Sequence, residues 1–373
     1  MKKIDHRGVR TWIEVDTKAL ENNYNIFRNL IHDKCKLMAI AKSNAYGHGI
    51  FDYAKAVEKL GADFIGVDSI TEAIALQKDG ITTPLFILGY TLPERLKDVI
   101  ERNISLTVST IELLDAMNKY HYSKKKFKVH LKIDTGMHRQ GFFVEDLPQV
   151  IEKLKNLPQV EVEGIYTHLA TPGDVEHGKF TKLQFAEFEK AVKIFNDNGL
   201  NPIRHAAATA GTMHHPESHF DMVRIGMGLM GVQSETTITN LQQILAWRTI
   251  ISEIKSLPKG SKIGYGLTET LTRNSKIAVL PIGYWHGYPR SLSSKGQILV
   301  RGKRCKVLGR IAMDMTVIDI TDVPTAKVGD IATIIGKDGD DEISAIEISG
   351  ISGVYHYEFL TRLNPLIKKF YLN

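Results

Sequence analysis

The chain has 373 residues, of which 43% are hydrophobic and 24% charged, a composition typical of a globular protein with room for more than one domain. The formal net charge is +6, but the basic residues are dispersed and the run at 124–126 has no interleaved aromatic residues, which argues against a nucleic-acid partner. Two cysteines exclude a disulfide framework. No apolar run approaches the roughly 18 residues of a membrane helix, and no secretion signal is present, so we expect a cytoplasmic protein without a membrane partner.

The first two thirds of the chain alternate short apolar runs with helix-like segments. An opening strand at 11–15 precedes an amphipathic helix capped by Asp16 or Thr17. Helix-like segments such as 50–56, 70–78, 111–119 and 179–196 then separate most of the later runs. These runs lie at 37–40, 64–67, 85–88, 104–108, 129–133, 162–166, 203–207 and 222–225. Eight such repeats predict parallel strands joined by right-handed crossovers and favour an α/β fold, a closed (β/α)8 barrel of the TIM type.

The pattern changes near residue 241. Glycines now separate short apolar strands, which lie at 276–281, 298–301, 317–320 and 331–335. Short strands divided by turns are typical of an all-β region. We therefore predict a barrel over residues 12–242 and a C-terminal mainly-β domain over 243–373, with residues 1–11 packing against the second domain.

Polar residues gather where the predicted barrel strands end, which is where barrel active sites form. They include Asp134, and Lys42 is the most informative of them. An ammonium at the end of a buried strand is costly to desolvate without a partner, and a lone lysine there would more often reach out to solvent. Nearby, Tyr46 offers a hydroxyl, and Gly47 and Gly49 allow the backbone to approach a ligand closely.

The segment 41–49, Ala-Lys-Ser-Asn-Ala-Tyr-Gly-His-Gly, resembles the cofactor-binding motif of the alanine racemase family, fold type III enzymes that use pyridoxal 5'-phosphate (PLP). The resemblance covers essentially the whole chain, because this family also has a barrel followed by a β-domain. It implies a PLP-dependent isomerase that interconverts L-alanine and D-alanine and supplies D-alanine for peptidoglycan. It also implies that Lys42 binds PLP covalently and that Tyr46 hydrogen-bonds the cofactor phosphate.

Racemisation removes the α-proton of an amino acid and returns one to the opposite face, so one acid/base group is required on each face. The resemblance implies that Lys42 and Tyr265 are these two groups. In the family the tyrosine enters the active site from the partner subunit, which implies a head-to-tail homodimer with shared sites. A tyrosine base needs a cation nearby, since its reference pKa is about 10. His168 and Arg224 match the family positions for this role.

Arg224 carries a further implication of the resemblance. The matching family arginine faces the pyridine nitrogen of PLP. Arginine donates but does not accept hydrogen bonds and stays charged, so the nitrogen would remain unprotonated and the cofactor would be a weaker electron sink. His205 matches the residue that hydrogen-bonds and orients this arginine.

The resemblance also implies residues for the substrate and the cofactor phosphate. Arg139 matches the arginine that contacts the substrate carboxylate, and Lys132 matches a lysine that is carbamylated in many family members. Met313 is expected to offer its backbone N–H to the substrate from the partner subunit, and Asp314 to order the pocket. The expected phosphate site consists of Tyr46, Thr209, Gly226, Met227 and Tyr357.

One motif points to a different class of protein. Residues 226–231 fit the G-x-G-x-x-G pattern of a dinucleotide site, which requires a helix directly after it. The following segment, 233–240, is polar and rich in β-branched residues. We therefore reject the dinucleotide interpretation and favour a phosphate pocket after the last barrel strand.

The chain departs from the family pattern at Ala208, where asparagine is usual, at Met230, where an aromatic residue is common, and at Ala312, often cysteine or serine. One methylene in a substrate changes discrimination by only ~1–3 kcal/mol, so a broader amino-acid racemase that also accepts serine remains an alternative. Arg224 argues against a PLP-dependent decarboxylase. Tyr265 and the β-domain argue against a non-catalytic PLP-binding barrel. We expect a small amino-acid substrate and no metal.

Overall fold

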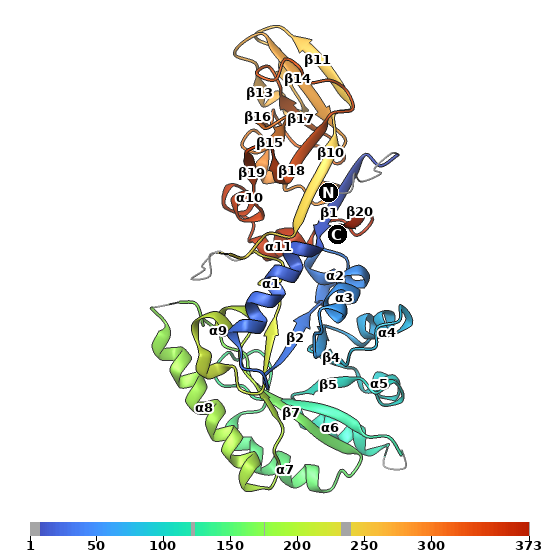
Figure 1. Ribbon diagram of the computed structural model, residues 1–373, viewed down its shortest axis with the longest axis vertical. Coiled ribbons are helices and arrows are strands. Elements are labelled where there is room, and N and C mark those ends of the chain that lie inside the picture. Colours follow the sequence, from blue (N-terminus) through green and yellow to red (C-terminus); the bar gives the residue numbers. More distant parts are fainter. Residues whose placement is uncertain (1–7, 121–123, 175, 233–239, 373) are drawn as a thin grey trace.

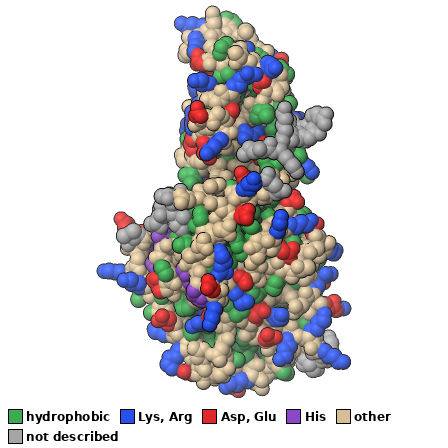
Figure 2. Space-filling model, viewed as in Figure 1, with side chains coloured by type: hydrophobic (Ala, Val, Ile, Leu, Met, Phe, Trp, Pro, Cys, Tyr) green, Lys and Arg blue, Asp and Glu red, His purple; other side chains and the backbone are tan. Residues whose placement is uncertain are grey.

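A computed structural model describes residues 8–120, 124–174, 176–232 and 240–372. A barrel and a mainly-β part follow one another along the long axis of the molecule (Figure 1). The segment 233–239, which we used against a dinucleotide site, lies outside the described residues. On the face shown in Figure 2, basic and acidic side chains are interspersed. Every helix among the described residues is too short or too polar to traverse a lipid bilayer.

The described residues of the first part form an eight-stranded parallel sheet, which confirms the predicted (β/α)8 fold. The barrel is nearly closed: a bridge between Ala208 and Arg224, and the 3.0 Å hydrogen bond from the Arg224 N–H to the Ala207 carbonyl, join its two end strands. The strands, in chain order, are β2 (Lys36–Ile40), β3 (Phe64–Val67), β4 (Leu85–Ile87), β5 (Ser105–Val108), β6 (Phe127–Lys132), β7 (Val160–Tyr166), β8 (Ile203–His205) and β9 (Met222–Ile225).

Helices surround this barrel on its outside (Figure 1). The first begins as predicted, because the Asp16 carboxylate accepts hydrogen bonds from the N–H groups of Lys18 and Ala19. The helices are α1 (Thr17–Leu30), α2 (Lys42–Tyr46), α3 (Ile50–Lys59), α4 (Ile70–Lys78), α5 (Leu96–Arg102), α6 (Ile111–Asn118), α7 (Leu147–Lys155), α8 (Gly178–Asp197) and α9 (Thr209–His214), with 3-10 turns η1 (Pro93–Arg95), η2 (Val144–Asp146) and η3 (Pro216–Ser218).

The opening strand, β1 (Thr11–Asp16), belongs to the second sheet and not to the barrel. It pairs antiparallel with β10 (Leu245–Ile250) and parallel with β20 (Lys368–Leu372). Its side chains Trp12, Ile13 and Val15 are fully buried, so this position between two strands removes a large apolar surface from water. The domain limits at residues 12 and 242 stay a prediction, but residues 12–16 pair with the C-terminal sheet.

The rest of the second part is mainly β, as predicted. The sheet that contains β1 continues through β15 (Gln297–Val300), β16 (Lys303–Lys306), β18 (Ile331–Asp338) and β19 (Asp341–Ile343). A three-stranded sheet contains β11 (Glu253–Leu257), β14 (Ser275–Leu280) and β17 (Thr316–Asp319), and a hairpin contains β12 (Lys262–Ile263) and β13 (Glu269–Thr270). The helical elements are α10 (Ala345–Ser352), α11 (His356–Thr361), η4 (Tyr265–Leu267), η5 (Tyr284–His286) and η6 (Arg290–Leu292).

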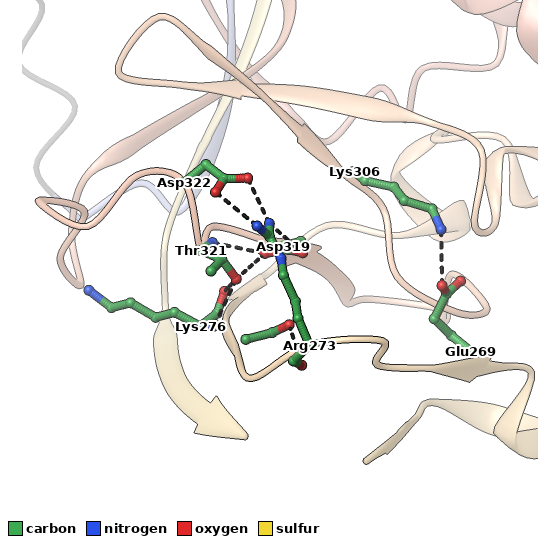
Figure 3. A network of polar contacts seen from close by, with 8 residues as sticks. Glu269, Arg273, Lys276, Lys306, Asp319, Thr321 and Asp322 are labelled. Carbon is green, nitrogen blue, oxygen red and sulfur yellow. Dashed lines mark hydrogen bonds and ion pairs between the residues drawn. The ribbon is translucent and has the colours of Figure 1, made fainter. Parts of the chain in front are cut away.

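Ion pairs connect the ends of these small β elements (Figure 3). The Arg273 guanidinium lies 2.6 Å from Asp322 and 3.5 Å from Asp319, and the Lys306 ammonium lies 2.9 Å from Glu269. The Arg273 and Lys306 side chains are about half exposed, so solvent screens these pairs. They link strands without forming a buried site.

Candidate active site

A cavity of about 780 Å³ opens at the C-terminal ends of the barrel strands. It gathers most of the predicted site residues of a single chain, although they come from distant parts of the sequence. A cavity of this size accommodates a cofactor together with a small substrate. The predicted residues that line it are Lys42, Tyr46, Lys132, Arg139, His168, Thr209, Arg224, Gly226, Met227 and Tyr357.

Lys42 begins a left-handed turn. The four residues after it, 43–46, all have φ between 50° and 57°, a conformation that costs ~1–2 kcal/mol for each L-residue. Two side chains compensate. The Asn44 amide oxygen accepts from the Ile50 N–H at 3.0 Å, and the Glu72 carboxylate accepts from the N–H groups of Ser43 and Asp68, both at 2.8 Å. The turn directs the chain sharply away from β2 and leaves the Lys42 side chain at the cavity.

The sequence did not predict this turn. We expected a glycine-containing loop, and Gly47 and Gly49 do have positive φ, but the left-handed residues before them are ordinary L-residues. Glu72 was missed because its place in Ser69-x-x-Glu72 is that of a helix-capping residue. Its carboxylate holds the turn that carries Lys42.

Arg224 lies at the end of β9 and is only 3% exposed. Its guanidinium donates to His205 Nδ1 at 3.0 Å and to the carbonyls of Thr167 and Ala206, each at 2.8 Å. The predicted contact with His205 is therefore present. Burial lowers the pKa of Arg224 to about 10, which leaves the group charged at neutral pH.

His168 lies beside Arg224, with its Nδ1 3.3 Å from the guanidinium. Burial, followed by the charges of Arg224 and Arg139, lowers the pKa of His168 to about 3. The imidazole is therefore neutral, and because arginine only donates, Nδ1 must accept and Nε2 carries the proton. This corrects the expectation that His168 shares the positive charge with Arg224: the cation is Arg224.

Lys132 is buried next to Arg139, and its Nζ donates to the Gln140 side-chain oxygen at 3.3 Å. It also lies 5.4 Å above the ring of Tyr166. Burial, followed by the positive charges of Arg139 and Arg224, lowers the pKa of Lys132 to about 8. At pH 7 Lys132 is therefore mostly charged, but the fraction that is a neutral, nucleophilic amine is far larger than for an ordinary lysine. Gln140 and Tyr166 were not among the predicted residues, although both flank predicted ones.

Hydroxyl groups and close backbone approach characterise the predicted phosphate site. Thr209 Oγ1 accepts from the N–H groups of Gly226 and Gly228 at 3.2 and 3.3 Å. The rings of Tyr46 and Tyr357 pack edge to face, with their centroids 6.0 Å apart. A Cβ at Gly226 would lie 2.6 Å from the Tyr46 hydroxyl, so glycine is required there. Burial raises the pKa of both tyrosines, which keeps their hydroxyls protonated as donors.

This donor set fits PLP. The cavity offers an amine, Lys42, for the aldehyde of the cofactor and neutral hydroxyl donors for its phosphate, and Arg224 supplies a permanent cation that only donates. Four cationic side chains and one carboxylate, Asp68, are among the lining residues. An anionic ligand is therefore electrostatically favoured there.

Four predicted residues do not line this cavity, and one of them, His205, still contacts it through Arg224. Tyr265 and Met313 are 72% and 54% exposed, and neither they nor Asp314 line it. Asp314 instead lies 4.0 Å from His286. Tyr265 lies between β12 and β13, and β13 is at the end of the molecule remote from α2 (Figure 1). The cavity of one chain thus holds one of the two predicted bases, Lys42.

Comparisons with known proteins show the family of this chain. Two family models match, "Alanine racemase, N-terminal domain" over residues 15–234 and "Alanine racemase, C-terminal domain" over residues 244–371. The alanine racemase of Methanococcus maripaludis is 37% identical over 97% of this chain and 98% of its own length, and that of Symbiobacterium thermophilum is 38% identical over 99% of each.

Solved structures extend the likeness to three dimensions. Alanine racemase from Bacillus anthracis with bound L-Ala-P has a TM-score of 0.91 at 31% identity and covers 98% of this chain and 95% of its own. Alanine racemase from Clostridium difficile 630 has a TM-score of 0.92 at 32% identity, covering 99% and 97%. The chain belongs to the alanine racemase family, whose members are generally PLP-dependent. It is an amino-acid racemase, an isomerase.

The lowered pKa of Lys132 predicts a pH-dependent stability. Lys132 titrates at about 8 in the folded chain and near 10.5 when unperturbed. Between these values the unfolded chain binds more protons than the folded one, so this residue makes the free energy of unfolding rise with pH. Lys132→Met should remove that rise, whereas Lys126→Met, which changes an exposed lysine before β6, should keep it. Urea unfolding in CO2-free buffer across this window measures the difference, and equal pH slopes for all three proteins would contradict the assignment.

Proposed function

We propose that this racemase interconverts L-alanine and D-alanine by a two-base mechanism with PLP held at Lys42. The observation that carries the proposal is the convergence in one cavity of Lys42, Arg224 and the hydroxyls of Tyr46, Thr209 and Tyr357. When bound, PLP supplies the electron sink for breaking the Cα–H bond of the substrate. The names of the relatives support alanine as the substrate.

The residues of this chain would divide the remaining tasks. Lys42 Nζ would hold and return the α-proton on one face. Arg224 would face the ring nitrogen, and since it cannot accept a proton, that nitrogen would keep its lone pair. Arg139 would bind the substrate carboxylate through its two-pronged guanidinium. The shape of the cavity would keep these groups and the substrate in register.

The second base would come from a partner. We propose that Tyr265 and Met313 of one chain complete the cavity of the other, in a head-to-tail homodimer. Their exposure in the single chain supports this, because Leu267 and Met315 are also exposed and a group of exposed apolar side chains marks a surface suited to association. Within the completed site, Arg224 would act on the tyrosine through neutral His168, and Asp314 would order the partner's contribution.

Of the three departures from the family pattern, Ala208 alone lines the cavity, while Met230 is fully buried in the core. A broader substrate range that includes serine would depend on Ala208, where a smaller side chain enlarges the space beside Thr209, and on Ala312, which would enter the completed site next to Met313. Our primary proposal remains alanine, with D-alanine used for peptidoglycan in the cytoplasm. Restored growth of a D-alanine-requiring bacterium that expresses this chain would support that use, and no restoration by an active enzyme would contradict it.

The central experiment is racemisation of L-alanine and D-alanine by the purified, PLP-loaded protein, followed by circular dichroism. Lys42→Ala should lower the rate in both directions by more than about a thousandfold, because it removes both the cofactor anchor and one base. It should also abolish the visible absorbance of lysine-bound PLP. Lys36→Ala, at the other end of β2, is the matched control and should change neither. An unaltered rate in Lys42→Ala would refute the assignment, and serine turnover equal to alanine turnover would favour the broader racemase.

A mixed dimer tests whether the site is shared. Lys42→Ala and Tyr265→Phe homodimers should each be inactive. A heterodimer purified through two different tags has one site carrying both substitutions and one intact site, so it should recover about half of the wild-type activity. If Tyr265 served its own chain instead, both sites of the heterodimer would carry a defect and no activity would return.

We also propose that Lys132 is carbamylated, which converts a buried cation into an anion able to pair with Arg139. The pKa of about 8 supports this, because CO2 adds to a neutral amine. Protein equilibrated with 13C-bicarbonate should show a carbamate carbonyl resonance that is absent from Lys132→Met and retained in Lys126→Met. A wild-type spectrum without that resonance would exclude the modification under those conditions.

A further inference from the structure

Arg224 is the first member of a buried hydrogen-bonded chain that continues well beyond His205. His205 Nε2 lies 2.8 Å from His130 Nδ1, and His130 Nε2 lies 3.0 Å from the Glu163 carboxylate. The Ser105 hydroxyl donates to the same carboxylate oxygen. The chain therefore runs from the cavity end of β9 across β8, β6 and β7 to the first residue of β5. Neither the motifs nor the proposed mechanism assign a role to His130 or Glu163.

Because one end of this hydrogen-bonded chain can only donate and the other can only accept, all of its hydrogen bonds must be donated in the same direction. A guanidinium only donates, so His205 Nδ1 accepts from Arg224, and the proton of neutral His205 must lie on Nε2. His205 then donates to His130 Nδ1, and the proton of His130 lies on Nε2, facing Glu163. An ionised carboxylate only accepts. Every donor thus meets an acceptor, and moving either imidazole proton to its other nitrogen would set donor against donor.

The protonation states agree with this arrangement. Both histidines are fully buried, and burial lowers the pKa of each below its usual value, so they are neutral. Burial acts to raise the pKa of Glu163, but hydrogen bonds from His130 and Ser105 outweigh it and hold the pKa below its usual value. None of the partners of Arg224 among the described residues is a carboxylate. The nearest carboxylate along its hydrogen bonds is Glu163, two imidazoles away.

The backbone of β6 and β7 makes room for these hydrogen-bonded side chains. The pairing of β6 with β7 shifts register at His130, so that Val129 faces Val162 and His130 faces Gly164. Glu163 is the extra residue, and such a bulge re-aims a side chain. A Cβ at Gly164 would lie 2.2 Å from His130 Nδ1, so only glycine leaves room for the ring.

Aromatic contacts fix the planes of both imidazoles. Tyr166 stacks on His205 with ring centroids 4.8 Å apart and planes 10° apart, and Phe86 packs against His130 at 4.5 Å. Tyr166 is itself held by a 2.8 Å hydrogen bond between its hydroxyl and that of Thr107. The same Tyr166 ring lies 5.3 Å from the Arg224 guanidinium. Rotation of either imidazole would therefore disturb the packing around Arg224.

We propose that Glu163 and His130 are positioning residues for Arg224. The Glu163 carboxylate accepts the last hydrogen bond of the series, and this fixes the tautomers so that His205 Nδ1 accepts from Arg224. The guanidinium is thereby held toward the cavity. This inference rests on the proposed function in one respect, that Arg224 faces the cofactor ring. The proton arrangement itself does not depend on the reaction. It can therefore be tested separately from activity.

The first test is the tautomeric state of the two histidines in PLP-loaded protein labelled with 15N-histidine. At neutral pH, long-range 1H–15N spectra should show both His130 and His205 as neutral, with the proton on Nε2. A proton on Nδ1 of either residue, or a charged imidazolium, would overturn the proposal without any variant being needed. If the tautomers are as expected but the wild-type protein does not racemise alanine, the proposed function fails and the hydrogen-bonded chain stands.

The second test uses three variants of β7. Glu163→Met removes the acceptor, Glu163→Gln keeps an acceptor oxygen without the charge, and Glu161→Met changes an exposed residue of the same strand. In Glu163→Met we expect a mixture of tautomers at His130 and kcat for alanine lower by about tenfold, the usual scale for removing an outer-shell partner. KM should change little, because Arg224 does not bind the substrate. Glu163→Gln should largely restore both readouts, and Glu161→Met should match the wild type.

If Glu163→Met lowers the unfolding temperature but leaves the histidine tautomers and kcat as in the wild type, Glu163 serves stability alone and the proposal is wrong. A Glu163→Met protein that fails to fold leaves Glu163→Gln and the wild-type tautomers to decide. In that case, Glu163→Gln is compared with a Ser105→Ala, Glu163→Gln double variant. If the two proteins depart from the wild type equally strongly in kcat and in the histidine tautomers, the proposed hydrogen-bonded chain is also contradicted.

Discussion

The site depends on the concentration of positive charge at one end of the barrel. Lys42, Lys132, Arg139 and Arg224 all line one cavity, where Asp68 is the single carboxylate among the lining residues. Burial lowers the pKa of Arg224, and burial together with the neighbouring positive charges lowers the pKa of Lys132 and of His168, which is neutral. Such a cavity is unfavourable by itself and favours ligands that bring negative charge. A phosphate and a carboxylate are the anions that PLP and an amino acid supply.

The fold holds these charges by two different means. At Lys42, a left-handed turn of four L-residues is maintained by Asn44 and Glu72. Strain of this kind persists only where surrounding contacts over-determine it, and it is found mainly at functional sites. At Arg224, a buried guanidinium is held by carbonyls and by a directed chain of imidazoles that ends at Glu163. Both arrangements use a carboxylate that does not line the cavity, Glu72 in one case and Glu163 in the other.

The local sequence pattern predicted many of the strands and helices. The strand–helix repeat gave the eight barrel strands, and α4 has the predicted bounds because its cap and apolar spacing are both local. Local pattern could not show which sheet β1 joins, since its partners β10 and β20 lie more than 200 residues away. The left-handed turn was missed because Ser43, Asn44 and Ala45 do not favour positive φ as strongly as glycine does. The contact of His130 with Glu163 was missed because it depends on a register shift between two strands.

The stability of the apo protein measures directly whether this cluster of cations binds an anionic cofactor. PLP should raise the unfolding temperature strongly, and pyridoxal, which lacks the phosphate, should raise it much less. The advantage of PLP should shrink in a Tyr46→Phe, Tyr357→Phe double variant, which loses two of the proposed phosphate donors. Equal effects of PLP and pyridoxal on the wild-type protein, or no effect of either, would show that the cavity is not an anionic cofactor site.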